Sequence, residues 1–216
     1  MQSYGSKHAK MNGMEHTWAP IGIDQVARRF AAIDVDWWVA GGLAIDLFLG
    51  FESRCHADID LEMFRRDREA LFDAFEGWEL FTVAQGALTR WNPGETIEDP
   101  VFGMWGRPSP DAAWGVEVML ADGDGDTWRF RRDNKISLAR EKLTHTTPNG
   151  IRYCTPEVQL LYKSKQARPK DDVDLAHCLH RMTTDQLLWL ANAVARTSPA
   201  HPWIGVLEAS MKPQHE

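Results

Sequence analysis

The chain has 216 residues and a mass of 24.6 kDa, enough for one large domain or two small ones with a hydrophobic core. Hydrophobic residues make up 44% and charged residues 25%, which argues against a disordered chain. The 31 acidic and 24 basic residues give a formal charge of −7, the opposite of the balance in proteins that coat nucleic acid. No apolar run has the length of a membrane span, and the few, widely spaced cysteines predict isolated thiols in a reducing cytoplasm.

The first two thirds of the chain predict a mixture of strands and helices. Apolar spacing indicates helices over 21–33, 43–49 and 66–75. A short apolar run at 37–40 predicts a buried strand that ends at a glycine pair. Alternating apolar and polar residues predict a strand around 58–63, and further strands are expected at 78–83, 86–91, 101–106 and 116–120. Residues 128–131 are expected to return antiparallel through an Asp-Gly turn at 122–126.

The character of the chain changes after residue 153. A Thr-Pro helix start at 155–156 and the apolar spacing beyond it predict helices over 155–165, 170–182, 184–196 and 202–210. Strands first and helices last indicate an α+β protein with a C-terminal helical region. We expect domains at 19–150 and 151–210, with flexible tails at 1–18 and 211–216.

Paired carboxylates on the predicted strands indicate a metal site. Asp58 and Asp60 are two residues apart, so a strand projects them from one face about 7 Å apart. Two such carboxylates repel each other unless a cation lies between them, and their oxygen atoms suit Mg²⁺. Glu117, on another alternating strand, is the third candidate ligand.

A glycine pair precedes these carboxylates. Gly41 and Gly42 lie where a strand gives way to a helix, and glycine lets a phosphate approach main-chain N–H groups there. A glycine pair, then a helix, then an Asp-x-Asp strand is an order that predicts a site for a metal-bound nucleoside triphosphate.

Several segments resemble a known family. Residues 38–46 (Trp-Val-Ala-Gly-Gly-Leu-Ala-Ile-Asp), 54–60 (Arg-Cys-His-Ala-Asp-Ile-Asp) and 117–120 (Glu-Val-Met-Leu) resemble the nucleotidyltransferase superfamily that includes DNA polymerase beta. Residues 122–128, 156–163 and 168–174 are similar to its small antibiotic-modifying branch, the aminoglycoside 2″-adenylyltransferase-like and lincosamide nucleotidyltransferase-like proteins. The resemblance implies a nucleotidyltransferase-fold mixed sheet with flanking helices, followed by a helical region.

The resemblance also implies a reaction. Two Mg²⁺ ions held by Asp58, Asp60 and Glu117 would bind the triphosphate of ATP or another NTP. A substrate hydroxyl would attack the α-phosphorus in line and release pyrophosphate. The family commonly has Asp where this chain has Glu117, which would serve as a metal ligand or as the base that takes the hydroxyl proton. Lys163 lies where family members use basic groups against the triphosphate, and Arg54 is a second candidate for a nucleotide contact.

Other interpretations stay open at this point. Lys163 and Lys165 would also suit a solvated helix face, and His56 would either orient a carboxylate or be a packed polar residue. The resemblance implies that the acceptor is a small hydroxylated molecule such as an aminoglycoside or lincosamide, and an acidic cleft would suit a cationic aminoglycoside. A protein or RNA acceptor, or nucleotide binding without turnover, are the alternatives. We expect a cytoplasmic monomer or homodimer and no polynucleotide partner. The resemblance associates the chain with antibiotic resistance, while its biological role stays open.

Overall fold

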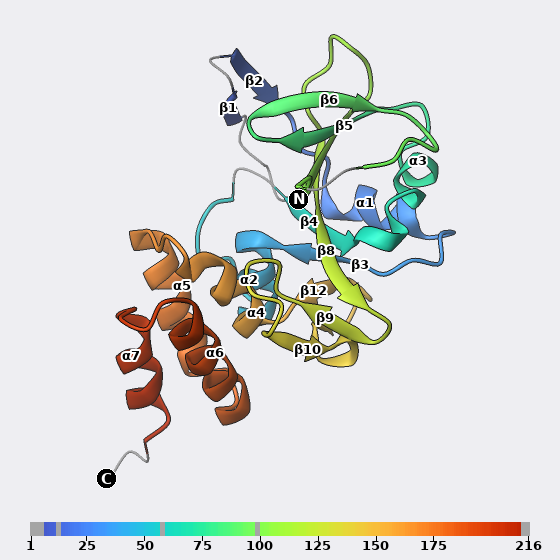
Figure 1. Ribbon diagram of the computed structural model, residues 1–216. Helices are drawn as coiled ribbons and strands as arrows, with labels where there is room; N and C mark the ends of the chain where they lie inside the picture. The colour runs from blue at the N-terminus through green and yellow to red at the C-terminus, as the bar shows by residue number, and fades with distance from the viewer. Residues whose placement is uncertain (1–6, 12–13, 57–58, 98–99, 213–216) are drawn as a thin grey trace.

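The protein is described here by a computed structural model that covers residues 7–11, 14–56, 59–97 and 100–212. A large mixed sheet forms the centre, and the helices that follow residue 155 gather beside it at one side (Figure 1). In the described part of the chain, none of the helices combines the length and the apolar character that crossing a membrane requires. The cysteines are free thiols, as the sequence predicted.

The sheet mixes parallel and antiparallel strands. β4 pairs parallel with β8 and antiparallel with β3, and β3 pairs parallel with β12. β9 (Thr127–Arg129) returns antiparallel along the far end of β8, as predicted, and pairs with β10 (Ser137–Ala139). The main order of the sheet is β11 (Thr144–Thr146), β12 (Arg152–Cys154), β3 (Trp37–Ala40), β4 (Asp60–Phe64), β8 (Val116–Asp124), β7 (Gly103–Arg107), β5 (Glu79–Ala84) and β6 (Ala87–Trp91).

The helices confirm the predicted α+β class. Those before the C-terminal region are α1 (Ile23–Phe30), α2 (Gly41–Leu49) and α3 (Ala70–Ala74), with short 3-10 turns at Arg65–Asp67 and Arg140–Lys142. The C-terminal region contains α4 (Pro156–Ser164), α5 (Pro169–Leu179), α6 (Thr184–Thr197) and α7 (Trp203–Ser210). A mixed sheet followed by a run of helices is the architecture that the sequence predicted.

Both faces of β4 are covered, and this sets the position of its acidic residues. Leu61 and Met63 are buried on one face. α1 covers that side of the neighbouring strand β3, where the ring of Phe30 stacks 5.2 Å from the ring of Trp37. Asp60 and Glu62 alternate with these apolar residues and so project from the opposite face. The period-2 pattern therefore places the acids on one wall of the sheet.

Two regions differ from the sequence prediction. Residues 1–18 were expected to form a flexible tail, but β1 (Lys7–Met11) and β2 (Met14–Trp18) pair as an antiparallel hairpin. Trp18 anchors it, because its ring meets the ring of Trp105 edge-on at 4.7 Å and is 4% exposed. Because the segment is mostly polar, its sequence did not predict that Trp18 would pack against the sheet. The sheet also includes β12, which lies beyond residue 150, where the sequence predicted a domain boundary. The division into two domains stays a prediction.

Candidate active site

Asp60 and Glu117 come together on one wall of the sheet. Asp60 begins β4 and pairs in register with Glu117 of β8. Residues in register on neighbouring strands share a face, and the strands are about 4.8 Å apart. Both side chains line a cavity of about 290 Å³ between the sheet and α4. Asp58, the other predicted metal ligand, lies outside the described residues. Its position on this face therefore stays a prediction.

The same wall carries a third acid that the sequence analysis did not select. Glu62 lines the cavity, is 5% exposed, and accepts a hydrogen bond of 3.0 Å from the indole Nε1 of Trp38. Burial raises the pKa of Glu62 to about 7, against the lowering effect of the Trp38 hydrogen bond and the Arg131 charge. The alternation that led to Asp60 continues to Glu62, so the signal was present in the sequence.

The glycine pair allows three side chains to close around the start of α2. Gly41 has φ +68°, and a Cβ there would lie 2.0 Å from Asp60 Oδ2. A Cβ on Gly42 would lie 2.3 Å from Arg54 Nη2 and 2.5 Å from His56 Cε1. A Cβ at either position would force these side chains to shift, because real Cβ contacts are not this short, and at Gly41 the positive φ also favours glycine. The main-chain N–H of Gly41, which the sequence predicted to face a phosphate, donates a hydrogen bond of 2.8 Å to the side-chain Oε1 of Gln159.

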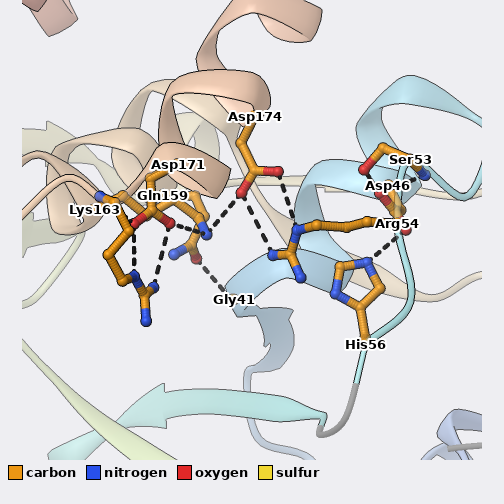
Figure 2. Close-up of polar contacts among 10 residues, drawn as sticks. Gly41, Asp46, Ser53, Arg54, His56, Gln159, Lys163, Asp171 and Asp174 are labelled. Atoms are coloured by element: carbon orange, nitrogen blue, oxygen red, sulfur yellow. Dashed lines mark hydrogen bonds and ion pairs between the residues drawn. The ribbon is translucent and has the colours of Figure 1, made fainter.

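His56 is a packed polar residue tied to α2. Its Nε2 lies 2.6 Å from Asp46 Oδ2, and its side chain is 6% exposed. The other carboxylate oxygen of Asp46 accepts from the main-chain N–H of Ser53 at 3.1 Å and from its hydroxyl at 2.5 Å. These contacts fix the loop that leads from α2 to β4 (Figure 2).

Lys163 and Arg54 take part in a buried ion-pair network. Lys163 Nζ lies 3.2 Å from Asp171 Oδ1 and 2.9 Å from Asp174 Oδ2. Arg54 Nε approaches Asp174 Oδ1 at 3.3 Å from the other side, which links the loop before β4 to α5 (Figure 2). Both carboxylates are 1% exposed and Lys163 is 8% exposed, so Lys163 does not lie on a solvated helix face. Its predicted contact with a phosphate stays a prediction.

A second cavity of about 600 Å³ adjoins the carboxylate cavity and shares Gly41 and Asp60 with it. The charged residues of its described lining are mostly basic, with Asp60 and Asp171 as the acidic members. Although the whole chain carries a net negative charge, this cavity is lined by more basic than acidic side chains. Such a lining suits a polyanion. The lining residues are Gly41, Gly42, Arg54, Cys55, His56, Asp60, Arg131, Arg132, Gln159, Tyr162, Lys163, Lys165, Gln166, Arg168, Lys170 and Asp171.

Arg131 and Arg132 are further site residues that the sequence analysis missed. They follow β9 and line both cavities. Their sequence signal is only a pair of arginines after a predicted strand, and nothing local says that the chain returns to Asp60 there. Within the described residues, no group of three His, Cys, Asp or Glu side chains is arranged to hold a metal ion. The carboxylate pair Asp60 and Glu117 is thus the part of the predicted metal site that the structure brings together.

Comparison with known proteins locates the similarity in the segment with the glycine pair. A sequence search of curated proteins gave no match. Among solved structures, a lincomycin-bound lincosamide antibiotic adenylyltransferase, LnuA, is 16% identical, with 74% of this chain and 97% of the other covered and a TM-score of 0.49. ANT(2″)-Ia in complex with adenylyl-2″-tobramycin is 17% identical, with 88% and 94% covered and a TM-score of 0.46. A nucleotidyltransferase-like antigen from Paracoccidioides brasiliensis is 17% identical, with 90% and 97% covered and a TM-score of 0.45.

The sequence model of one protein family matches residues 22–89. This segment contains the glycine pair, the loop with Arg54 and His56, and all of β4. The family is described as aminoglycoside-2″-adenylyltransferase, an enzyme family, and the match confirms the predicted resemblance and the predicted class of enzyme. The segment that contributes Asp60 and Glu62 to the carboxylate wall therefore resembles a nucleotidyltransferase of the aminoglycoside-2″-adenylyltransferase family.

Proposed function

We propose that the chain transfers a nucleoside monophosphate, most readily AMP from ATP, to a hydroxyl of a small molecule in a Mg²⁺-dependent reaction. The observation that carries this proposal is the register of β4 and β8. It sets Asp60 opposite Glu117 on the wall of one cavity, next to a second cavity rich in cations. A carboxylate pair beside a polycationic cavity suits a metal-bound triphosphate.

The donor atoms fit Mg²⁺. Asp60 and Glu117 offer carboxylate oxygens from neighbouring strands, and oxygen is the ligand atom that Mg²⁺ prefers. We assign these two residues to the metal, with Asp58 as the third ligand expected from the sequence. When bound, Mg²⁺ neutralises charge on the triphosphate and on the leaving pyrophosphate.

The transfer itself needs one bond formed and one broken. The acceptor oxygen bonds to the α-phosphorus, the bond to the α,β-bridging oxygen breaks, and pyrophosphate leaves with the electron pair. The hydroxyl proton goes to a base, for which Glu117 is the candidate if it is not fully engaged as a ligand. The basic lining of the second cavity, with Arg54, Lys163 and Lys170, would hold the β- and γ-phosphates.

The acceptor is assigned only as a class. The family match supports a small hydroxylated molecule such as an aminoglycoside, with a role in resistance to it, and the sequence resemblance adds lincosamides as a second class of acceptor. Two alternatives remain: a protein or RNA acceptor, and a protein that binds nucleotide without turnover. Transfer of labelled AMP to a macromolecule would identify the first, and ATP binding without pyrophosphate release in any condition would identify the second.

The test is pyrophosphate release from Mg²⁺-ATP across a panel of hydroxylated acceptors. We expect Asp60→Asn and Glu117→Gln each to lower the rate by at least about 100-fold, because each removes a negative charge that would hold Mg²⁺ at the reacting phosphate. Asp73→Asn, at an exposed position of α3, is the matched control and should keep the wild-type rate. Retained release in both site variants, with wild-type melting temperatures, would refute the carboxylate mechanism.

A further inference from the structure

Three cavities meet at one point of the molecule. Besides the two described above, a cavity of about 830 Å³ lies between the segment after β9, α4 and the end of α6. Arg131 and Arg132 line all three cavities. Within the described residues, they are also the cations that line the cavity of Asp60 and Glu117. A ligand that reaches the carboxylates therefore passes beside these two guanidinium groups.

Arg131 is held by aromatic rings rather than by acids. Its guanidinium carbon lies 5.0 Å from the centroid of the Phe102 ring and 5.4 Å from that of Tyr162. In the described structure, neither a hydrogen bond nor an ion pair reaches this guanidinium. Within the described residues its N–H donors are therefore not taken up by a protein acceptor, and two aromatic rings lie beside the group.

Unlike Arg131, the other basic groups near the carboxylates have hydrogen-bond or ion-pair partners within the described structure. Arg54 and Lys163 line the second cavity and already pair with buried carboxylates of α5, which partly neutralise their charge. Arg132 is exposed and donates to the main-chain oxygen of Tyr162 at 3.1 Å. Partial desolvation of its guanidinium and the neighbouring Arg131 charge lower the pKa of Arg132, so the two guanidinium groups repel each other. An anion placed between them would relieve that repulsion.

We propose that Arg131 is a catalytic residue that binds the non-bridging oxygens of the α-phosphate, the group that is transferred. The assignment rests on the proposed function. The attacked phosphorus must lie at the cavity of Asp60 and Glu117, and a planar guanidinium matches two phosphoryl oxygens at once. Arg131 gives up no proton: it neutralises charge on the phosphoryl oxygens while the acceptor oxygen bonds and pyrophosphate leaves.

One structural role has to be separated from this proposal. The charge of Arg131 lowers the pKa of the buried Glu62, so Arg131 could act solely as the counter-charge of that acid. Loss of Arg131 would then harm the enzyme by leaving Glu62 uncompensated, and the double variant with Glu62→Gln would recover. A phosphate ligand cannot be recovered in this way, because the neutral amide introduced by Glu62→Gln does not replace a guanidinium.

The experiment compares Arg131→Met, Arg131→Lys and the double variant Arg131→Met with Glu62→Gln. Arg129→Met is the matched control, since this arginine of β9 bonds to Asp124 Oδ2 at 2.9 Å and lines none of the three cavities. Pyrophosphate release from Mg²⁺-ATP gives kcat and KM across the acceptor panel, and calorimetry gives the Kd of Mg²⁺-ATP.

We expect Arg131→Met to lower kcat by about 100-fold or more, with the Kd of Mg²⁺-ATP changed by less than about threefold, because the contact strengthens in the transition state. Arg131→Lys should recover part of the rate, the double variant none of it, and Arg129→Met should match wild type. Wild-type kcat in Arg131→Met, or recovery in the double variant, would overturn the assignment and leave the proposed function standing. A wild-type chain that releases no pyrophosphate with any acceptor would overturn both.

Discussion

Gly41 is the residue whose backbone fixes the geometry of the carboxylate cavity. It has a left-handed φ of +68°, and the carboxylate of Asp60 occupies the space where a Cβ would stand. Its N–H is bound by Gln159 of α4, from the C-terminal helical region. One backbone position thus brings together β3, β4 and α4.

Gly41→Ala should cost more than backbone strain alone. The positive φ contributes about 1–3 kcal/mol of destabilisation, and the new Cβ must also displace Asp60. We therefore expect both a lower melting temperature and loss of pyrophosphate release. Gly94→Ala is the control, because Gly94 has φ +78° but nothing lies within 4 Å of a Cβ placed there. Equal stability and full activity in both variants would contradict this account of Gly41.

At the residue scale, the sequence indicated the carboxylates and missed the arginines. Asp60 and Glu117 lie on strands whose alternation assigns each side chain to a face, so a local pattern was enough. Arg131 follows a strand of three residues, and its place beside Asp60 depends on how β9 turns back along β8. That is a long-range pairing, and no local spacing encodes it.

At the scale of elements, the link between α4, α5 and the loop before β4 is electrostatic. Asp171 and Asp174 of α5 are buried, and each contacts Lys163 of α4. Arg54 extends the network to the loop that leads to β4. Buried carboxylates are stable only while their partners are present, so Lys163 contributes to folding whether or not it also contacts a phosphate.

Lys163→Met should destabilise the fold by up to about 3–5 kcal/mol, because it removes the cation that two buried carboxylates share and leaves each with a single arginine partner. Lys165→Met is the matched control, since Lys165 is exposed and lines the same basic cavity. Urea unfolding monitored by tryptophan fluorescence gives both values. If Lys163→Met unfolds at the wild-type urea concentration and only weakens ATP binding, then Lys163 acts as a phosphate ligand and not as part of the fold.

The helices were easier to predict than the short strands. The Thr-Pro start of α4 and the apolar spacing of α6 are local signals, and both helices form within one or two residues of the predicted range. β10, β11 and β12 have three residues each, too few for an alternation to be seen. Their positions are decided by the strands they pair with, which the sequence does not name.

At the scale of the whole molecule, the buried acids make stability depend on pH. Burial alone would raise the pKa of Asp171, but hydrogen bonds from Arg168 and the charge of Lys163 lower it to about 2. The folded state therefore holds this proton less tightly than the unfolded chain. Asp171 stabilises the fold by about 2 kcal/mol above its ordinary pKa of 3.8, and this contribution is lost as pH falls through about 2.

Asp171→Asn should remove that part of the pH dependence. We expect the free energy of unfolding of the wild type to fall between pH 4 and pH 2 by about 2 kcal/mol more than that of the variant. Asp185→Asn, at an exposed position of α6, should follow the wild-type curve. Parallel curves for the wild type and Asp171→Asn, measured by urea unfolding at each pH, would show that the ion pairs do not carry the acid sensitivity.

The pairing of β12 with β3 has a consequence for how the chain folds during synthesis. Val39 is fully buried, yet one edge of β3 is covered by Tyr153, which follows it by more than a hundred residues. Until β12 leaves the ribosome, β3 presents an apolar, unpaired edge, the kind of surface that joins other chains. The strand that leads into the glycine pair is therefore completed late, and its closure over so long a loop is expected to be a slow step in folding.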